Sequence, residues 1–341
     1  MGGDFGPAAI VPAAALALAE APDIRFIFFG DERRISALLD REPRLKAASS
    51  IVHTDKVIAS DEKPSAALRS GKDSSMRLAI EAVRDGKAGG IVSAGNTGAL
   101  MATAKIVLKC LPGISRPAIA SVFPGVRSET VVLDLGANIN CDAEILIQFA
   151  VLGAVYARVV RGINNPTVGL LNVGSEDMKG HDQLRAASTI LAQVQFPGKY
   201  IGFVEGNDIP EGSVDVVVTD GFTGNVALKI AEGVGHLTTH FVREAFESSL
   251  LAKLGALIAS GALRKVKRRM DSRFYNGGMF LGLSGICVKS HGGMDKTGFS
   301  RAILLAAGLV RQGYNTRVAQ EIDQLMHQES FISALASAGG A

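Results

Sequence analysis

Cysteine is scarce in this sequence of 341 residues, which contains only Cys110, Cys141 and Cys287. The three lie far apart, and no two of them form a C-x-x-C pair. An odd and sparse set of cysteines argues against a disulfide framework and is typical of proteins in a reducing cytosol. We therefore expect a cytoplasmic protein.

Several catalytic motifs are also missing. The sequence has no G-x-x-x-x-G-K-[ST] phosphate loop, no G-x-G-x-x-G dinucleotide fingerprint, no H-E-x-x-H helix and no G-x-S-x-G nucleophile elbow. Its six histidines do not have metal-ligand spacing. These absences disfavour nucleotide hydrolysis, ordinary dinucleotide binding, zinc catalysis and α/β-hydrolase chemistry. We expect no metal and no cofactor.

Charge and hydropathy disfavour two further classes. The formal net charge is only +3, with 47% hydrophobic and 20% charged residues, as in a globular protein that does not bind nucleic acid through bulk charge. Residues 8–19 are rich in alanine, but no basic segment precedes them as in a signal peptide, so we expect a first helix there. No apolar run reaches the ~18 residues of a membrane span, and we expect no bilayer crossing.

The sequence does contain short apolar runs that alternate with helix-length segments. The runs predict strands at 24–29, 90–93, 118–123, 130–135, 167–172, 200–204 and 214–219. The segments between them predict helices that include 74–84, 97–109, 142–160, 182–195 and 223–243. This alternation predicts an α/β protein with βαβ units, a mainly parallel sheet and helices on both faces.

Four of these strands lead into turns that are rich in Gly, Asn, Thr and Asp, at residues 94–98, 136–138, 174–180 and 220–225. Because the carboxyl ends of parallel strands share one edge of a sheet, we expect the four turns to form one polar crevice. Glycine lets the backbone approach a ligand, and helix N-termini offer N–H groups to an anion. Ordinary helix caps and tight turns use the same residues, so for each single turn that alternative stays open.

The longer motifs resemble those of one family. In chain order they are Met1-Gly2-Gly3-Asp4 with Gly6-Pro7, Lys72-Asp73-Ser74-Ser75-Met76, Val92-Ser93-Ala94-Gly95-Asn96-Thr97-Gly98-Ala99, Leu133-Asp134-Leu135-Gly136-Ala137-Asn138, Leu171-Asn172-Val173-Gly174-Ser175-Glu176-Asp177 with Lys179-Gly180, Phe203-Val204-Glu205-Gly206-Asn207-Asp208, Val218-Thr219-Asp220-Gly221-Phe222-Thr223-Gly224-Asn225 and His291-Gly292. The match runs from Met1 to about Leu325, nearly the whole chain. The combination closely resembles the PlsX-type acyl-ACP:phosphate acyltransferases, in which ACP is acyl carrier protein.

The resemblance implies a fold like that of the isocitrate and isopropylmalate dehydrogenases, shared with phosphate acetyltransferases. That fold is a three-layer, doubly wound α/β domain, here over residues 1–341. The resemblance also implies a homodimer that moves a fatty acyl group from acyl-ACP to inorganic phosphate, at the first step of phospholipid synthesis. Family members carry a short strand that ends in Asp before the Met-Gly-Gly-Asp motif, and we expect this chain to lack that strand.

Acyl transfer to phosphate requires two positioned reactants and a stabilised oxyanion, because phosphate is itself a good nucleophile. We expect Lys179 to supply a cation, Asn225 an amide donor and His291 a proton for the leaving thiolate. A surface lysine, a helix cap and a structural histidine are the respective alternatives. Asp134 and Asp220 would orient their neighbours as acceptors. The candidate residues for binding phosphate or the thioester are Asn96, Thr97, Gly98, Asp134, Gly136, Asn138, Asp220, Gly221, Thr223 and Gly224.

Residues 238–275 form a candidate helical hairpin. Leu250, Leu254, Leu257 and Ile258 recur at helical spacing, and Lys253 is the only charged residue between positions 248 and 263. A basic cluster follows, comprising Arg264, Lys265, Lys267, Arg268 and Arg269. This pattern favours peripheral contact of the four apolar residues with an anionic membrane. A dimer-interface helix, or a docking surface for acidic ACP, is the alternative.

Two other functions remain as alternatives. A metal- and NAD-dependent decarboxylating dehydrogenase has the same fold, but it would need an arginine-rich pocket, and the crevice turns contain no arginine. A non-catalytic acyl-carrier or membrane scaffold would be expected to have lost the glycines and asparagines of these turns, which are all present.

Overall fold

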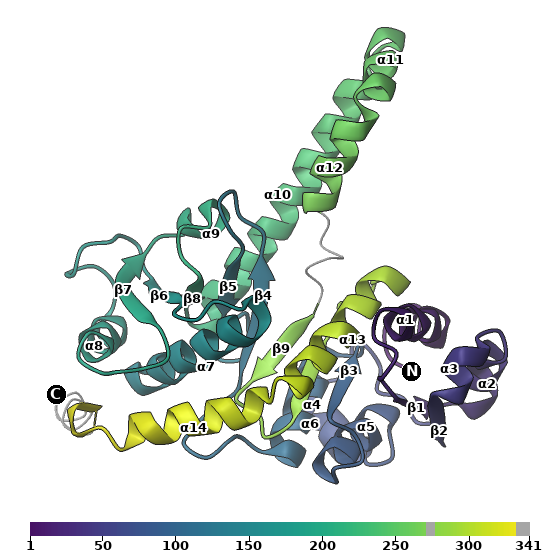
Figure 1. Cartoon of the computed structure of the whole chain (residues 1–341), viewed down its shortest axis with the longest axis horizontal. Coiled ribbons are helices and arrows are strands. Elements are labelled where there is room, and N and C mark those ends of the chain that lie inside the picture. The colour runs from purple at the N-terminus through teal and green to yellow at the C-terminus, as the bar shows by residue number, and fades with distance from the viewer. Residues whose placement is uncertain (271–276, 332–341) are drawn as a thin grey trace.

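The computed structural model describes residues 1–270 and 277–331. It is a mixed α/β protein with a central 8-stranded sheet in the order β3-β10-β9-β4-β5-β8-β6-β7, and a separate 2-stranded sheet, β1-β2 (Figure 1). The strands are β1 (Phe26–Gly30), β2 (Ser49–His53), β3 (Gly90–Ser93), β4 (Ala118–Phe123), β5 (Thr130–Leu133), β6 (Thr167–Leu171), β7 (Lys199–Val204), β8 (Val216–Val218), β9 (Gly278–Leu281) and β10 (Ile286–Lys289).

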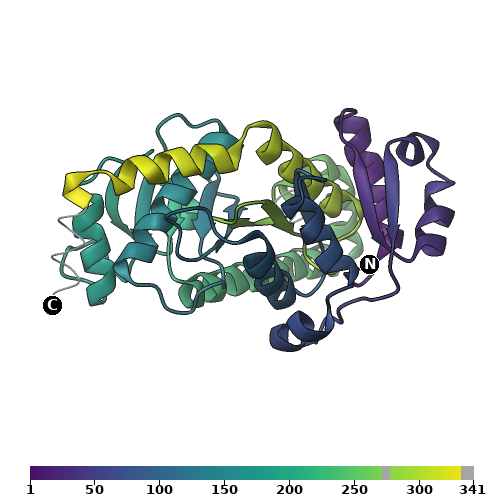
Figure 2. The same cartoon turned by 90° about the horizontal axis from the view of Figure 1, so that it is seen from below.

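The helices cover both ends of the elongated molecule (Figure 2). They are α1 (Pro7–Glu20), α2 (Glu32–Leu39), α3 (Pro43–Ala47), α4 (Pro64–Ser70), α5 (Ser75–Arg84), α6 (Thr97–Leu108), α7 (Ala143–Arg161), α8 (Asp182–Leu191), α9 (Asp208–Glu211), α10 (Gly221–Glu247), α11 (Leu250–Ile258), α12 (Ser260–Met270), α13 (Lys296–Arg311) and α14 (Tyr314–Met326). All seven predicted strands are present to within two residues at each boundary. The strands β2, β9 and β10 were not predicted.

The prediction of a mainly parallel sheet with its four turns at one edge is wrong in the centre of the sheet. There β10 pairs with β9, β9 with β4, and β4 with β5, all antiparallel. Only residues 124–129 join β4 to β5, and a parallel crossover needs about a dozen residues or more, so β5 turns back beside β4. Therefore β5, β8 and β6 point opposite to β3 and β10. The turn at 94–98 cannot share an edge with the other three.

The helix α7 is the centre of the main core. Asp142 caps its first turn by accepting from the backbone N–H of Ile145, and Gly162 ends it in the left-handed conformation, as is common at helix C-termini. We expected no apolar run long enough for a membrane span, but α7 has that length and apolar composition. However, 83% of its apolar stretch is buried inside the protein. It is a core helix, held between the sheet, α8 and α14.

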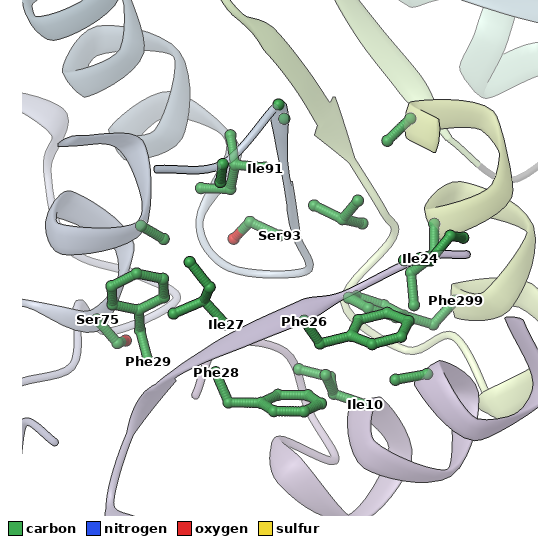
Figure 3. Close-up of a pocket in the computed structure, with 18 of the residues that line it drawn as sticks. Ile10, Ile24, Phe26, Ile27, Phe28, Phe29, Ser75, Ile91, Ser93 and Phe299 are labelled. Atoms are coloured by element: carbon green, nitrogen blue, oxygen red, sulfur yellow. The ribbon is translucent and has the colours of Figure 1, made fainter. Parts of the chain in front are cut away.

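The small sheet is separated from the main sheet by an apolar cavity of about 490 Å³. The cavity lies between β1 and β3, and Phe26, Phe28, Ile91 and Phe299 line it (Figure 3). Among the described residues, β1 pairs only with β2, and β3 pairs only with β10. Both β1 and β3 are therefore edge strands of their sheets.

A long helical arm leaves the body at the carboxyl end of β8. Its first part is α10, and α11 and α12 fold back from its far end (Figure 1). The side chains of α11 are mostly exposed, and none of them is buried. Within the candidate hairpin at 238–275, residues 271–275 lie outside the described residues.

Candidate active site

The carboxylate of Asp134, just after β5, organises one end of the sheet. The side chain has 0% exposure. One oxygen accepts from the backbone N–H groups of Ile119 (2.9 Å), Gly136 (3.2 Å) and Ala137 (3.0 Å). The other accepts from the backbone N–H of Asn138 (2.7 Å) and from its side-chain amide (2.8 Å). Burial raises the pKa of Asp134 above its ordinary value, and these donors counteract part of that rise.

The turn at 136–138 is therefore wrapped around a protein carboxylate. Its three backbone N–H groups already have an acceptor in Asp134. The side-chain amide of Asn138 is also engaged, because it donates to the carbonyl oxygen of Pro117 (2.8 Å) as well as to Asp134. In this arrangement Asp134 and Asn138 hold the shape of the turn. The N–H donors of the turn and of the Asn138 amide are therefore already engaged within the protein.

The first turn of α10 packs directly on this loop. The backbone N–H of Gly221 donates to the carbonyl oxygen of Asn138 (2.7 Å), and a Cβ at Gly221 would lie 2.6 Å from that oxygen. A Cβ at Gly224 would overlap the carbonyl oxygen of Asp134. Asp220 caps the helix by accepting from the backbone N–H (2.8 Å) and hydroxyl (2.9 Å) of Thr223. Glycine is required at both positions, because any side chain would push the helix off the loop.

Asn225 lies above Gly136 on the exposed side of this contact. A Cβ built on Gly136, whose φ is 128°, would lie 3.5–3.7 Å from the side-chain atoms of Asn225. Since Asp220 is the residue that caps α10, Asn225 is not a helix cap. Within the described residues its amide makes no hydrogen bond. The amide of Asn225 is thus available to a ligand, whereas that of Asn138 is not.

Lys179 follows β6, which pairs with β8 on the side away from β5. Its side chain is 51% exposed, and its Nζ lies 3.9 Å from Glu176 Oε1, a loose contact. The amide of Asn172 holds the loop by donating to the Lys179 carbonyl oxygen (3.1 Å). The structure therefore places Lys179 at the same end of the sheet as Asn225, as an exposed cation.

Asn96, Thr97 and Gly98 lie elsewhere, at the carboxyl end of β3. The Asn96 amide donates to the carbonyl oxygens of Ser60 (3.0 Å) and Glu62 (2.8 Å), and its oxygen accepts from the backbone of α6. Asn96 is therefore a helix cap that also tethers the preceding loop. Thr97 is exposed at the first position of α6.

His291 belongs to this second group, because it follows β10, which pairs with β3. It is exposed, and its Nδ1 accepts from the backbone N–H of Gly293 (3.2 Å). The next residue, Gly292, accepts from the backbone N–H of Asp4 (2.9 Å). The strands β9 and β4 separate β10 from β5. The structure therefore does not bring His291 next to Asn225.

One residue of this second group was missed at the sequence level. Lys289 ends the apolar strand β10 and is half-buried beside Asp4. Burial lowers its pKa to about 8, and the Asp4 carboxylate counteracts part of that drop. A lysine at the end of an apolar strand is ordinarily a solvated residue, so only the tertiary structure reveals its environment. No cluster of potential metal ligands occurs within 1–270 and 277–331.

The four predicted membrane-contact residues Leu250, Leu254, Leu257 and Ile258 are all exposed on α11. Of the basic cluster, Arg264 and Lys265 are exposed on α12. The side chains of Lys267, Arg268 and Arg269 lie outside the described residues.

Sequence comparison identifies the family. A family profile described as "Fatty acid synthesis protein" matches residues 1–317. The chain belongs to this family. It is 56% identical to the phosphate acyltransferase of Rhodospirillum centenum over 325 residues, 95% of this chain and 92% of that one. It is 55% identical to the phosphate acyltransferase of Paramagnetospirillum magneticum over 337 residues, 99% of this chain and 96% of that one. These relatives confirm the resemblance to the PlsX-type phosphate acyltransferases.

Solved structures of phosphotransacetylases have a similar fold. A phosphotransacetylase from Streptococcus pyogenes matches with a TM-score of 0.60 at 18% identity, over 89% of this chain and 91% of that one. The EutD phosphotransacetylase from Staphylococcus aureus matches with a TM-score of 0.53 at 15% identity, over 89% and 99%. At this level of identity, the likeness shows the fold alone.

Proposed function

We propose that this chain transfers a fatty acyl group from the thioester of acyl carrier protein to inorganic phosphate, giving an acyl phosphate for phospholipid synthesis. The relatives named phosphate acyltransferase, more than half identical over nearly the full length, carry this proposal. The open amide of Asn225 above Gly136 supports it. Inorganic phosphate is the acceptor, and the reaction requires no metal or redox cofactor.

In the proposed reaction, a phosphate oxygen attacks the thioester carbonyl carbon and forms a tetrahedral oxyanion. The oxyanion collapses by breaking the C–S bond, which leaves an acyl phosphate and a carrier thiolate that takes up a proton. The Asn225 amide donates to the oxyanion or to phosphate, and Lys179 offsets the negative charge. Losing one such donor typically costs a factor of about 10²–10³ in turnover. His291 is the candidate proton donor to the thiolate, and it follows β10, which β9 and β4 separate from β5.

We propose that the fold is of the isocitrate and isopropylmalate dehydrogenase type implied by the resemblance, and that the protein is a homodimer. Along α10 the exposed apolar side chains Val226, Ile230, Val234, Leu237 and Phe241 recur every three or four residues. This spacing places them on one face of the helix, as in helices that pair with another helix. In the proposed homodimer, a second copy of the chain covers these apolar side chains of α10.

We further propose that the protein is cytoplasmic and contacts the membrane peripherally through α11 and α12. The exposed leucines of α11 are followed along the chain by α12, which carries the exposed Arg264 and Lys265. An apolar helix beside basic residues suits the surface of an anionic bilayer. Such attachment would release acyl phosphate beside membrane-bound enzymes. The same basic residues could receive acidic ACP.

The test is to incubate the purified protein with acyl-ACP and inorganic phosphate and to trap acyl phosphate with hydroxylamine. Hydroxamate that depends on both substrates supports the proposal. Absence of hydroxamate, together with an absorbance change at 340 nm when a hydroxyacid and NAD are supplied, would favour the dehydrogenase alternative. Absence of both would favour the scaffold.

A further inference from the structure

The apolar cavity between β1 and β3 has backbone polar groups along its β1 side. The backbone N–H of Phe26 donates to the carbonyl oxygen of Ala48, next to β2, at 3.0 Å. Because the N–H and C=O groups of successive strand residues point to opposite edges, those of Ile27 and Phe29 point away from β2. Both residues line the cavity. Among the described residues, this edge of β1 therefore faces the cavity without a strand partner.

The opposite side of the cavity is the free edge of β3. The backbone N–H of Ser290 donates to the carbonyl oxygen of Ser93 at 2.9 Å, so the backbone groups of Ser93 point toward β10. Those of Val92 point the other way, toward the cavity that this residue lines. An unpaired strand edge is a template for pairing with another extended segment. Both edges thus offer hydrogen bonds to a segment between them.

Helices cover both faces of this gap, as they would cover a continuous sheet. Figure 3 shows Phe29 on the side of Ser75 in α5. The side chains of Phe26 and Phe28 lie on the other side, toward Ile10 of α1. The helix α5 contacts both β1 and β3, and α13 contacts both α1 and β3. The cavity therefore lies within the layer of the sheet, between two layers of helices.

The amino ends of β1 and β3 lie at the same end of the cavity. The side chain of Arg311, at the end of α13, donates to the carboxylate of Asp23 at 3.0 Å. A Cβ at Gly89 would lie 2.8 Å from Cγ1 of Val310, the preceding residue of α13. Asp23 precedes β1 and Gly89 precedes β3, so the two strands run in the same direction.

Met1 and Gly2 close the other end of the gap. A Cβ at Gly30, the last residue of β1, would lie 2.1 Å from Cγ of Met1, and one at Gly2 would lie 2.6 Å from Cα of Gly95, just after β3. Met1 also lines the cavity, and burial lowers the pKa of its amino group to about 6. The amino group of Met1 is thus held between the carboxyl ends of the two strands.

The two strand edges distinguish an extended peptide from other apolar ligands. An alkyl chain would fill the space but leave the backbone groups without partners, which is costly away from water. An extended peptide would pair with both edges, and its side chains would meet the apolar residues on both faces. One strand residue takes up roughly 160 Å³, from a rise of about 3.3 Å, a strand spacing of about 4.8 Å and a layer distance of about 10 Å. The cavity of about 490 Å³ therefore accommodates roughly three such residues.

We propose that the cavity between β1 and β3 is a strand position, filled by an extended apolar segment that is bonded to the amino group of Met1. The segment runs parallel to β1 and β3, because their amino ends lie at the far end of the cavity from Met1. It joins the 2-stranded and the 8-stranded sheet into one. The inference is independent of the proposed function, since it involves no substrate.

The test compares two extended chains with the unextended chain. One carries five Val and Ile residues before Met1, the length of β1, and the matched control carries five Gly and Ser residues. The apolar extension is expected to raise Tm by about 5 °C or more, because it buries apolar side chains in the cavity. Deuterium exchange at the amides of β1 and β3 should slow about tenfold or more, and exchange in α14 should not change. The Gly and Ser extension should leave both measurements unchanged.

Equal Tm values for the two extensions would overturn the proposal, as would a rise in Tm without slower exchange in β1 and β3. A saturated fatty acid that raises Tm of the unextended chain more than the apolar extension does would identify an acyl site instead. If the apolar extension prevents folding, the free Val and Ile pentapeptide, made soluble by N-terminal lysines, is titrated against the unextended chain. Slower exchange in β1 and β3 then supports the strand position, and unchanged exchange overturns it.

Discussion

At the scale of single residues, tight backbone contacts decide which side chains are available. Asp134 takes up five N–H donors, and the contacts of Gly221 and Gly224 hold α10 against that loop. What remains open are the amide of Asn225 and the ammonium of Lys179. Two conspicuous motif residues, Asp134 and Asn138, thus become supports for the residues that we expect to contact substrate.

Lys179→Ala is expected to reduce turnover by about a hundredfold or more, because a key charge partner of the oxyanion or phosphate would be lost. The fold should be unaffected, since the ammonium makes only a loose surface contact. Hydroxamate formation and a thermal melt measure the two effects, with Lys105→Ala as the matched control. Near-normal turnover in Lys179→Ala would remove this residue from the mechanism.

Asn225→Ala is also expected to impair turnover while Tm stays within a few degrees, because Asp220 and not Asn225 caps α10. Asn225→Asp provides the matched comparison. It preserves the shape but replaces the amide donor by a carboxylate that repels phosphate, so its loss should be at least as large. If stability falls and activity per folded molecule is unchanged, Asn225 has a structural role only.

Gly224→Ala and Gly233→Ala make a matched pair within α10. The first adds a Cβ that overlaps the Asp134 carbonyl oxygen, and the second adds one in open space. We expect Gly224→Ala to lower the free energy of unfolding by about 1–3 kcal/mol or more, as overpacking does. Gly233→Ala should raise it by up to about 1 kcal/mol, the difference in helix propensity. Urea titrations measure both, and similar effects at the two positions would contradict the contact.

At the scale of elements, the arm formed by α10, α11 and α12 stands apart from the body (Figure 1). Core elements such as α7 have buried apolar residues, whereas the apolar residues of α11 are exposed. Exposed apolar surface on a stable helix generally marks an interaction site. We therefore expect the arm to contact a partner or a surface outside the chain.

Leu254→Glu combined with Leu257→Glu is expected to abolish sedimentation with anionic liposomes, because two charges would have to enter the interface. Solution activity should be largely retained, since both positions are far along the arm from Asn225. Neutral liposomes provide the control, because the basic residues add about 1 kcal/mol each only against anionic lipid. A double variant that still pellets would show that α11 is not the anchor. Dissociation into monomers would identify it as a dimer contact.

At the scale of the whole molecule, three antiparallel pairs in the centre of the sheet leave β5, β8 and β6 running opposite to β3 and β10. These strand directions divide the signature turns into two groups at opposite ends of the sheet, one around Asn225 and one around Asn96 and His291. The structure thus replaces the single predicted crevice by two separate groups of turns. The exposed apolar face of α10 begins at Val226, directly after Asn225. Formation of the proposed dimer would therefore place the second copy of the chain near Asn225.

Ile230→Glu combined with Leu237→Glu is expected to convert the proposed homodimer into monomers, because two buried charges without partners would oppose the apolar contact. Light scattering after size exclusion measures the mass directly. Glu232→Gln changes the opposite face of α10 and should leave the dimer intact. If the double variant remains a dimer, the interface lies elsewhere.

The sequence alone determined the local elements and the chemistry. Apolar runs bounded by turns located seven strands, β1 and β3 to β8, because such strands are recognisable from nearby residues. The motifs identified the family, and Lys179 and Asn225 emerged as candidates from their positions. The strands β2, β9 and β10 were missed, since each is only four or five residues long and its pairing depends on residues distant in the sequence.

Only the tertiary structure decided the strand directions, and with them which turns share an end of the sheet. Pairing depends on contacts between residues that are distant in sequence, and the short link at 124–129 was the one local sign of the reversal. The same contacts decided that the carboxylate of Asp134 is enclosed while the amide of Asn225 is open. They also left Lys289 desolvated, because the segments that surround it come from opposite ends of the chain.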